Sequence, residues 1–246
     1  MNAKKIEGQL VSKISSFFKQ NNKARAVLGL SGGIDSAVVL ILLVKALGKE
    51  NVTALILPNT QVTKQENVLD AEELANSHGV KHLVIEIDQF LRPFAALPWE
   101  QLKIAKANLN ARIRALILYN YANAYNALVA GTGNKSEIYM GYFTKHGDSA
   151  ADFFPIGDLY KKDVRALAKQ IGLSKKFLEK VPSAELWVGQ EDEREMGISY
   201  DVLDELLPII LKGGRVPQKL RDAAEKISAT MKETEHKRKM PPILKL

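Results

Sequence analysis

Two adjacent glycines stand between a short apolar run and a longer one, and this arrangement limits the possible folds more than any other feature. The run from Ala24 to Leu30 predicts a buried strand, and the stretch from Asp35 to Leu47 predicts a helix that is apolar on nearly every face. Between them, Gly32 and Gly33 allow a tight turn and let the backbone approach a ligand without clashes from Cβ atoms. The sequence therefore predicts a strand–loop–helix unit with a ligand beside the loop.

The chemistry of this loop favours an anionic ligand. Free N–H groups at the start of the following helix, together with the helix dipole, attract phosphate, and Ser31 and Ser36 add hydroxyl groups. Asp35 would repel a phosphate unless a divalent cation lies between the two anions, and Mg²⁺ prefers such oxygen ligands. The alternative is that the glycines only form a sharp turn and that Asp35 caps the helix.

Strand-like and helix-like segments alternate along the chain, which predicts an α/β fold with a doubly wound, mainly parallel sheet and flanking helices. Further strands are predicted at Asn51–Leu57, His82–Ile87 and Asn126–Ala130, and helices at residues 3–20, 65–77, 99–125, 160–171, 199–211 and 218–234. Residues 140–157 are expected to form a long ordered loop. The sequence shows neither a repeat nor a low-complexity linker, so we expect one domain over residues 1–246 with a helical C-terminal third.

Composition excludes several classes of site. The 246 residues include no cysteine, which excludes disulfides, thiolate metal sites and cysteine nucleophiles. No apolar run approaches the roughly 20 residues that a membrane-spanning helix needs, and the first residues show no signal-peptide pattern. We therefore expect a soluble, cytoplasmic protein without membrane contact. The net charge of +7 is spread along the chain apart from residues 236–239, which favours small phosphorylated ligands over nucleic acid.

A second group of motifs lies near the middle of the chain. Thr132 comes just after a predicted strand, at the edge where doubly wound folds bind ligands. Glu137 opens a short helix there and could supply a second carboxylate to Mg²⁺. The loop that follows carries Lys145, Asp148 and Asp152, which offer a cation and hydrogen-bond acceptors to a polar substrate.

Taken together, these blocks resemble the NAD synthetase family, one branch of the pyrophosphatase-type synthetases. The resemblance rests on GLSGGIDS at residues 29–36, on GTGNKSE, GYFTKHGD and DFFPI between residues 131 and 156, and on EHKRKMPP near the end of the chain. It implies an adenine nucleotide alpha hydrolase-like fold and ammonia-dependent amidation of deamido-NAD to NAD, the last step of NAD biosynthesis. ATP would be the co-substrate and Mg²⁺ the cofactor, and the reaction would pass through an acyl-adenylate with release of AMP and pyrophosphate.

The resemblance also implies roles for individual residues. Asp35 and Glu137 would bind Mg²⁺, and Lys161 would support the departing pyrophosphate. The residues that would contact ATP are Gly29, Leu30, Ser31, Gly32, Gly33, Ile34, Asp35, Ser36, Thr132, Lys161 and Ser183. Those that would contact deamido-NAD are Arg112, Lys145, Asp152, His236 and Lys237. Family members commonly have threonine in place of Ser183, and many bacterial members have an acidic residue in place of Gly133.

The lack of cysteine also bears on the nitrogen source. Amidotransferases that release ammonia from glutamine generally use a cysteine nucleophile, so free ammonia is the expected donor. The resemblance further implies a homodimer, with the helix predicted at residues 99–125 as the candidate contact surface. Two rival functions are another synthetase with the same loop, such as a GMP synthetase core or a lysidine synthetase, and a non-catalytic ATP-binding sensor.

Without the resemblance, several of these residues have simpler interpretations. Lys161 and Lys162 begin a predicted helix and would be solvated, and residues 236–239 would form a flexible basic tail. Arg112 and Arg114 would belong to an exposed helix face. The acidic stretch Glu191–Glu193 predicts a loop that is either mobile over the site or simply at the surface.

Overall fold

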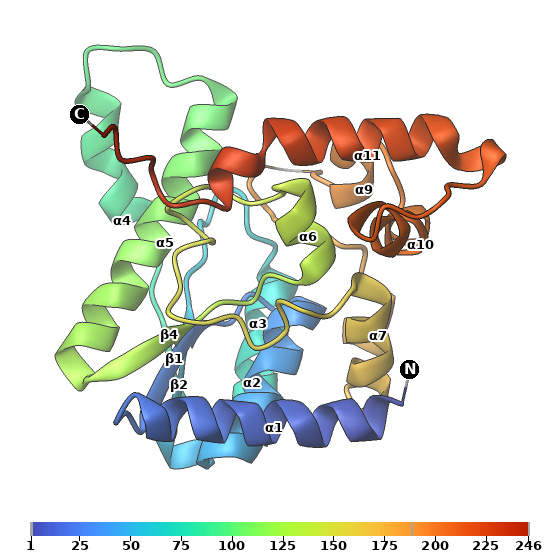
Figure 1. The fold of residues 1–246 in the computed structure, drawn as a ribbon. Helices are drawn as coiled ribbons and strands as arrows, with labels where there is room; N and C mark the ends of the chain where they lie inside the picture. The colour runs from blue at the N-terminus through green and yellow to red at the C-terminus, as the bar shows by residue number, and fades with distance from the viewer. Residues whose placement is uncertain (1, 188, 246) are drawn as a thin grey trace.

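A parallel sheet forms the centre of the molecule (Figure 1). The computed structural model describes residues 2–187 and 189–245, and within them the sheet has four strands in the order β3-β2-β1-β4. The strands are β1 (Arg25–Gly29), β2 (Val52–Ile56), β3 (Lys81–Val84) and β4 (Ala127–Ala130). The chain moves outward from β1 to β3 and then returns to the other side of β1. At such a reversal the loops after the two diverging strands leave room for a ligand.

Both faces of the sheet are buried at β1, β2 and β4, which explains their nearly continuous apolar runs, whereas β3 at the edge is largely exposed. In β1, Ala26 and Leu28 pack against one layer of helices, and Val27 packs against the other. Val27 lies opposite Thr53 of β2 and Val129 of β4. The register therefore brings the carboxyl ends of β1 and β4 to the same edge of the sheet.

Helices cover the two faces unequally (Figure 1). The helices that contribute to the larger core are α1 (Ala3–Gln20), α2 (Ile34–Leu47), α3 (Gln65–Ser77), α7 (Lys161–Gln170) and α8 (Lys175–Glu179). The other face is covered by α5 (Lys103–Tyr125), with α4 (Asp88–Leu91) and the 3-10 turn Arg92–Ala96 at its edge. The α2 helix is buried along almost its whole length, as its apolar sequence predicts.

The C-terminal third forms a separate helical layer with its own core. It consists of α9 (Asp192–Met196), α10 (Tyr200–Leu211) and α11 (Arg221–Glu233), which pack beside α6 (Lys135–Met140). Tyr200 and three leucines of α10 are fully buried there. This layer stands next to the loops at the carboxyl edge of the sheet, so it can contribute side chains to a site at that edge.

The DFFPI motif is fixed directly to the end of β4. Asp152 N–H donates to the carbonyl of Val129 at 2.9 Å, and Gly131 N–H donates to the carbonyl of Phe153 at 2.9 Å. Ala130 and Phe153 form a parallel bridge. Two motif blocks that are separate in the sequence therefore meet at one corner of the sheet.

The structure confirms the predicted fold class and the order of its major elements. The long helix begins at Lys103 rather than at Trp99, whose side chain is largely exposed, and the helix predicted at 218–234 is a 3-10 turn (Gln218–Leu220) followed by α11. Several short elements are not among those predicted from the sequence: α4, α8, α9 and the 3-10 turns Lys49–Asn51 and Glu235–Lys237. No helix in the described part of the chain is long and apolar enough to cross a membrane.

Candidate functional site

The loop after β1 is hydrogen-bonded within itself. Ser36 Oγ accepts a hydrogen bond from Ser31 N–H at 3.2 Å and donates to the carbonyl of Gly33 at 3.0 Å, and the two serine hydroxyls lie 3.1 Å apart. Gly32 has a φ of +78°, and a Cβ atom there would lie 2.2 Å from the carbonyl oxygen of Asn67. Position 32 therefore requires glycine both for its conformation and for its contact with α3.

The same loop leaves the start of α2 available to an anion. Gly33 is the N-cap residue and has no side chain that could cap the helix, so the first N–H groups of α2 lack a side-chain partner there. Asp35 lies in the first turn of α2, but its carboxylate is directed across the site toward Asn134 and Lys161. The alternative interpretation of Asp35 as a helix cap is therefore wrong.

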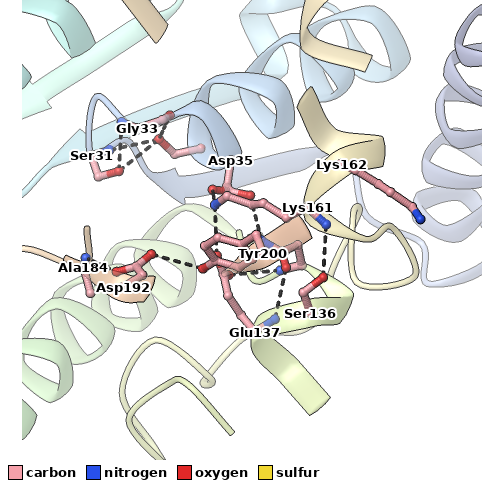
Figure 2. Close-up of polar contacts among 12 residues, drawn as sticks. Ser31, Gly33, Asp35, Ser136, Glu137, Lys161, Lys162, Ala184, Asp192 and Tyr200 are labelled. Carbon is pink, nitrogen blue, oxygen red and sulfur yellow. Dashed lines mark hydrogen bonds and ion pairs between the residues drawn. The ribbon is translucent and has the colours of Figure 1, made fainter. Parts of the chain in front are cut away.

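Lys161 lies between two carboxylates (Figure 2). Its Nζ is 2.5 Å from Asp35 Oδ2 and 3.1 Å from Glu137 Oε1, and its side chain is only 2% exposed. Burial would lower the pKa of Lys161, but the two carboxylates outweigh this effect and raise it. The ammonium group is therefore charged and buried, and the interpretation of Lys161 as a solvated lysine is wrong. We call Asp35, Glu137 and Lys161 the charge centre.

Carboxyl groups outnumber cationic groups around the charge centre. Burial raises the pKa of Glu137 to about 7, against the lowering effect of Lys161, and the nearby Asp35 and Asp192 carboxylates raise it further. Burial also raises the pKa of Asp192. Three carboxyl groups thus share the field of one ammonium group, an environment that favours an additional cation.

Asn134 fixes the two carboxylates relative to each other. Its buried side chain donates from Nδ2 to Asp35 Oδ1 at 2.9 Å and accepts at Oδ1 from Glu137 N–H at 3.1 Å. Asn134 N–H donates to Glu137 Oε2 at 3.3 Å, which completes a capping box at the start of α6. Asn134 is not among the predicted site residues, although an asparagine three residues before a glutamate is a recognised sign of this cap.

The start of α7 is held by a second set of polar groups. Ser136 Oγ accepts a hydrogen bond from Lys161 N–H at 3.1 Å and donates to the carboxylate of Asp204. Asp204 also accepts from Lys162 N–H at 2.7 Å. These contacts join α6, α7 and α10, and they fix the backbone from which Lys161 extends.

Asp192 and Tyr200 approach the charge centre from the C-terminal layer (Figure 2). The Tyr200 hydroxyl lies 3.1 Å from Asp192 Oδ2 and 3.3 Å from Glu137 Oε1, and both side chains are buried. The interpretation of Glu191–Glu193 as a simple surface loop is therefore wrong at Asp192, which begins α9. No sequence signal singled out either residue.

Two further residues expected to contact ATP, Thr132 and Ser183, lie on other segments. Thr132 is the second residue after β4 and is half-buried. Ser183 is exposed, and its Oγ accepts from Glu185 N–H at 3.1 Å. The next residue, Ala184, donates its N–H to Asp192 Oδ1 at 3.1 Å, which connects this segment to the charge centre.

The residues expected to contact deamido-NAD form a second group, beside α5. Arg112 donates from Nε and Nη2 to the carbonyl of Lys145, at 3.3 Å each. Lys237 Nζ donates to the carbonyls of Gly141 and Phe143 at 2.7 and 3.0 Å. The loop of the GYFTKHGD motif is thus held by α5 on one side and by the C-terminal segment on the other. The interpretation of residues 236–239 as a flexible tail is wrong at Lys237.

Asp152 and His236 are placed less directly. Asp152 Oδ2 accepts from Val129 N–H at 2.7 Å, and Tyr119 Oη lies 3.4 Å from Asp152 Oδ1. His236 lies in the 3-10 turn Glu235–Lys237. Within residues 2–187 and 189–245, no hydrogen bond links Asp152 or His236 to the charge centre.

The donor set fits a magnesium ion that takes part of its coordination from phosphate. The described residues contain no group of three or more His, Asp and Glu side chains arranged to hold a metal. Asp35 and Glu137 nevertheless supply two carboxylates beside the loop that joins β1 to α2 (residues 30–33), which we call the phosphate loop. Mg²⁺ is usually bound by one or two carboxylates together with substrate phosphates and water, so this pair is sufficient.

Comparisons with known proteins found matches over nearly the whole chain. The family model described as NAD synthase matches residues 6–241. An NH3-dependent NAD⁺ synthetase of Archaeoglobus fulgidus is 47% identical over 246 residues, which cover 100% of this chain and 98% of that protein. Among solved structures, an NMN synthetase from Francisella tularensis is 38% identical with a TM-score of 0.87, and an NH3-dependent NAD synthetase from Campylobacter jejuni is 35% identical with a TM-score of 0.85. Each of these two matches covers 100% of both chains.

Proposed function

The chain belongs to the NAD synthase family, and from this premise we propose that it amidates deamido-NAD to NAD, using ATP and free ammonia. The observation that carries the proposal is the charge centre beside the phosphate loop. The carboxylates of Asp35 and Glu137 and the buried ammonium group of Lys161 meet at the carboxyl edge of the sheet, beside the loops that follow β1 and β4. A non-catalytic ATP sensor would need the phosphate loop but would have no use for this buried arrangement.

The first chemical step activates a carboxylate, which is otherwise a poor acyl donor. An oxygen of the nicotinate carboxylate attacks the α-phosphorus of ATP, and the bond from that phosphorus to the bridging oxygen breaks. Pyrophosphate leaves with the electron pair, and an acyl-adenylate remains. The N–H groups at the start of α2, together with Ser31 and Ser36, would hold the phosphates, and Lys161 would add a positive charge beside them.

The two carboxylates would hold Mg²⁺. When bound there, the ion would neutralise part of the triphosphate charge and orient the phosphates. Asn134 keeps Asp35 and Glu137 in fixed positions, and it contributes to the reaction by maintaining the geometry of the site. Preorganisation of this kind reduces the rearrangement that is needed when the substrates bind.

In the second step, the nitrogen lone pair of ammonia attacks the acyl carbon. The bond from that carbon to the adenylate oxygen breaks, AMP leaves, and the nitrogen loses a proton to give the amide. No protein nucleophile takes part, which agrees with a chain that has no cysteine. Free ammonia is the proposed nitrogen source, as the names of the similar NH3-dependent synthetases suggest.

The second group of residues would bind deamido-NAD. Arg112, Lys145 and Lys237 supply positive charge beside the GYFTKHGD loop, and Asp152 supplies an acceptor. We also propose a homodimer that forms along α5. This helix carries exposed apolar side chains, including Leu116 at 66% and Ile104 at 55% exposure, and a partner subunit would cover them.

A mononucleotide substrate is the second candidate, because one of the similar solved structures is an NMN synthetase. Nicotinate mononucleotide carries the same carboxylate as deamido-NAD but lacks the adenylyl half. Both substrates would use the same charge centre. The two substrates differ in whether the part outside the nicotinate ring would need the positively charged residues beside α5, which are Arg112, Lys145 and Lys237.

The test is an assay with purified protein, ATP, Mg²⁺ and an ammonium salt, with either deamido-NAD or nicotinate mononucleotide as acceptor. We expect equal amounts of NAD and AMP from deamido-NAD, a much lower kcat/KM with the mononucleotide, and no product when glutamine replaces ammonium. Asp35→Ala and Glu137→Ala should abolish product formation with either acceptor. A higher kcat/KM with the mononucleotide would overturn the proposed substrate, and failure to cleave ATP with either acceptor would overturn the proposed reaction.

A further inference from the structure

We propose that Asp192 and Tyr200 are positioning residues that hold the segment 182–187, and with it Ser183, against the charge centre. The inference rests on the proposed function, in which Ser183 contacts ATP. Ser183 is exposed, and within the described part of the chain its side chain forms no hydrogen bond with Asp35 or Glu137. Its position must therefore be set by its neighbours.

The two carboxylate oxygens of Asp192 bind different parts of the molecule, one the segment 182–187 and the other Tyr200. Oδ1 accepts from Ala184 N–H at 3.1 Å, and Oδ2 accepts from the Tyr200 hydroxyl at 3.1 Å. The backbone N–H of Asp192 also donates to the carbonyl of Pro182 at 3.1 Å. The residues on both sides of Ser183 are thus attached to one buried residue, Asp192, which binds Ala184 through its side chain and Pro182 through its backbone and is 4% exposed.

Tyr200 connects this anchor to the charge centre. Its hydroxyl lies 3.3 Å from Glu137 Oε1, and its ring centre lies 5.0 Å from Lys161 Nζ. The side chain is fully buried in the core of the C-terminal layer, and its backbone N–H donates to Glu193 Oε1 at 2.9 Å. Because this core fixes the ring, the hydroxyl is a stable reference point for Asp192.

A purely structural role for Asp192 would predict different contacts. An aspartate at the start of a helix usually accepts hydrogen bonds from the N–H groups of the first turn. Asp192 is the first residue of α9, but its side chain is bonded to Ala184, eight residues earlier, and to Tyr200, eight residues later. Both bonds connect separate segments at the site.

Lys180, two residues before the segment 182–187, is hydrogen-bonded to the phosphate loop. Lys180 Nζ donates to the carbonyl of Gly32 at 3.1 Å and lies 2.5 Å from both Asn67 Oδ1 and Asp70 Oδ2. Lys180, which precedes Ser183 in the chain, is therefore bonded to the phosphate loop, and Asp192, which follows it, is bonded to Tyr200, whose hydroxyl lies beside Glu137. Ser183 lies between these two anchors.

The test compares Asp192→Ala, Asp192→Asn and Tyr200→Phe with the unaltered protein. The first readout is the Kd for α,β-methylene-ATP, an analogue that cannot be cleaved between its α- and β-phosphates. The second is hydrogen exchange of the backbone amides in residues 182–187. Tyr121→Phe is the matched control, because it removes a tyrosine hydroxyl that bonds to Thr53 Oγ1 at 3.1 Å on the opposite face of the sheet.

We expect Asp192→Ala to weaken analogue binding about tenfold and to accelerate exchange in residues 182–187 by a similar factor, as for the loss of one hydrogen bond to a charged group. Tyr200→Phe should act in the same direction, about threefold, because Asp192 keeps its bond to Ala184. Asp192→Asn should rescue most of the loss, since its oxygen can accept from Ala184 and its amide can donate to Tyr200. Tyr121→Phe should change neither readout.

Unchanged binding and unchanged exchange in a folded Asp192→Ala protein would overturn the inference. If that variant does not fold, a Tyr200→Phe protein with unaltered binding and exchange would overturn it equally. If Asp192→Asn binds the analogue as weakly as Asp192→Ala and exchanges as fast, the result would also contradict the assigned hydrogen bonds. Neither readout requires turnover, so a failure of the proposed amidation would be recognised separately, from the absence of NAD in the assay of the unaltered protein.

Discussion

Lys161 Nζ and Asp35 Oδ2 lie 2.5 Å apart, although 126 positions separate the two residues in the chain. The contact joins the start of α7 to the phosphate loop in a buried environment. It also places a permanent positive charge beside a carboxylate that we assign to Mg²⁺. The metal would therefore bind in a site that already contains a cation, and the two must share the same pair of carboxylates.

Replacing Lys161 by methionine should lower the free energy of unfolding by about 3–5 kcal/mol, because the change leaves Asp35 and Glu137 buried without their cation. Mg²⁺ should recover part of this loss by binding between the carboxylates. We expect the thermal midpoint of Lys161→Met at pH 8 to rise more with added MgCl2 than that of the unaltered protein. Scanning calorimetry with and without the salt would measure both effects.

The neighbouring Lys162→Met is the control for that experiment. Lys162 Nζ donates to the backbone carbonyl of Asp204 at 3.0 Å and contacts neither carboxylate of the charge centre. Its variant should therefore respond to Mg²⁺ as the unaltered protein does. Equal responses of both methionine variants would contradict a metal site between Asp35 and Glu137.

Alanine at position 32 should disable the phosphate loop, whereas alanine at position 172 should not. Gly32 and Gly172 have nearly the same φ, +78° and +79°. A Cβ at position 32 would lie 2.2 Å from a backbone oxygen, but one at position 172 would meet no atom within 4 Å. We expect Gly172→Ala to cost about 1–2 kcal/mol of stability and to leave ATP binding unchanged.

Gly32→Ala should cost more stability than Gly172→Ala and should weaken binding of α,β-methylene-ATP at least about tenfold, because the loop must move away from α3. Chemical denaturation and calorimetric titration of both variants would provide the comparison. Similar affinities for the two variants would show that the close contact with Asn67 does not set the shape of the loop.

We expect Asp70 to make the free energy of unfolding depend on pH in the acid range. Burial opposes ionisation of Asp70, but hydrogen bonds from Lys176 and Lys180 outweigh it and hold the pKa below the ordinary 3.8. The unfolded chain therefore takes up this proton at a higher pH than the folded protein does. The stabilisation is complete above 3.8 and is lost as the pH falls through the lower pKa of the folded state.

For Asp70→Asn we expect a loss of about 1–3 kcal/mol at neutral pH, since hydrogen bonds to a charged group are removed. The difference from the unaltered protein should shrink below pH 3.8. Urea unfolding curves at intervals from neutral pH into that acid range would test this. A difference that stays constant over the whole range would mean that Asp70 acts by packing and not by its charge.

The order of strands and helices could be predicted because each major element has a strong local pattern. The strand β1 is an apolar run followed by glycines, and α2 is apolar on nearly every face, which matches its burial from Ile34 to Leu43. Two of the helices that were not predicted, α8 and α9, have only five residues each. A helix of this length is too short for its periodic pattern to appear in the sequence. Their positions depend on tertiary contacts, such as those of Asp192.

The charge centre could be predicted only in part. Asp35 and Glu137 stood out because each follows a strand that ends at the same edge of the sheet. The burial of Lys161 could not be read from two consecutive lysines at a helix start, because it results from the meeting of α2, α6 and α7. The role of Asn134 could have been predicted from its capping pattern. Tyr200 could not, because in the sequence it looks like any other residue on the apolar face of α10.

The central claim is that the nicotinate carboxylate is activated as an adenylate, and transfer of oxygen tests it most directly. Deamido-NAD labelled with ¹⁸O at both carboxylate oxygens would be converted with ATP, Mg²⁺ and ammonium, and the products would be analysed by mass spectrometry. The proposed mechanism predicts one ¹⁸O atom in AMP and one in the amide of NAD. Unlabelled AMP formed together with NAD would contradict it.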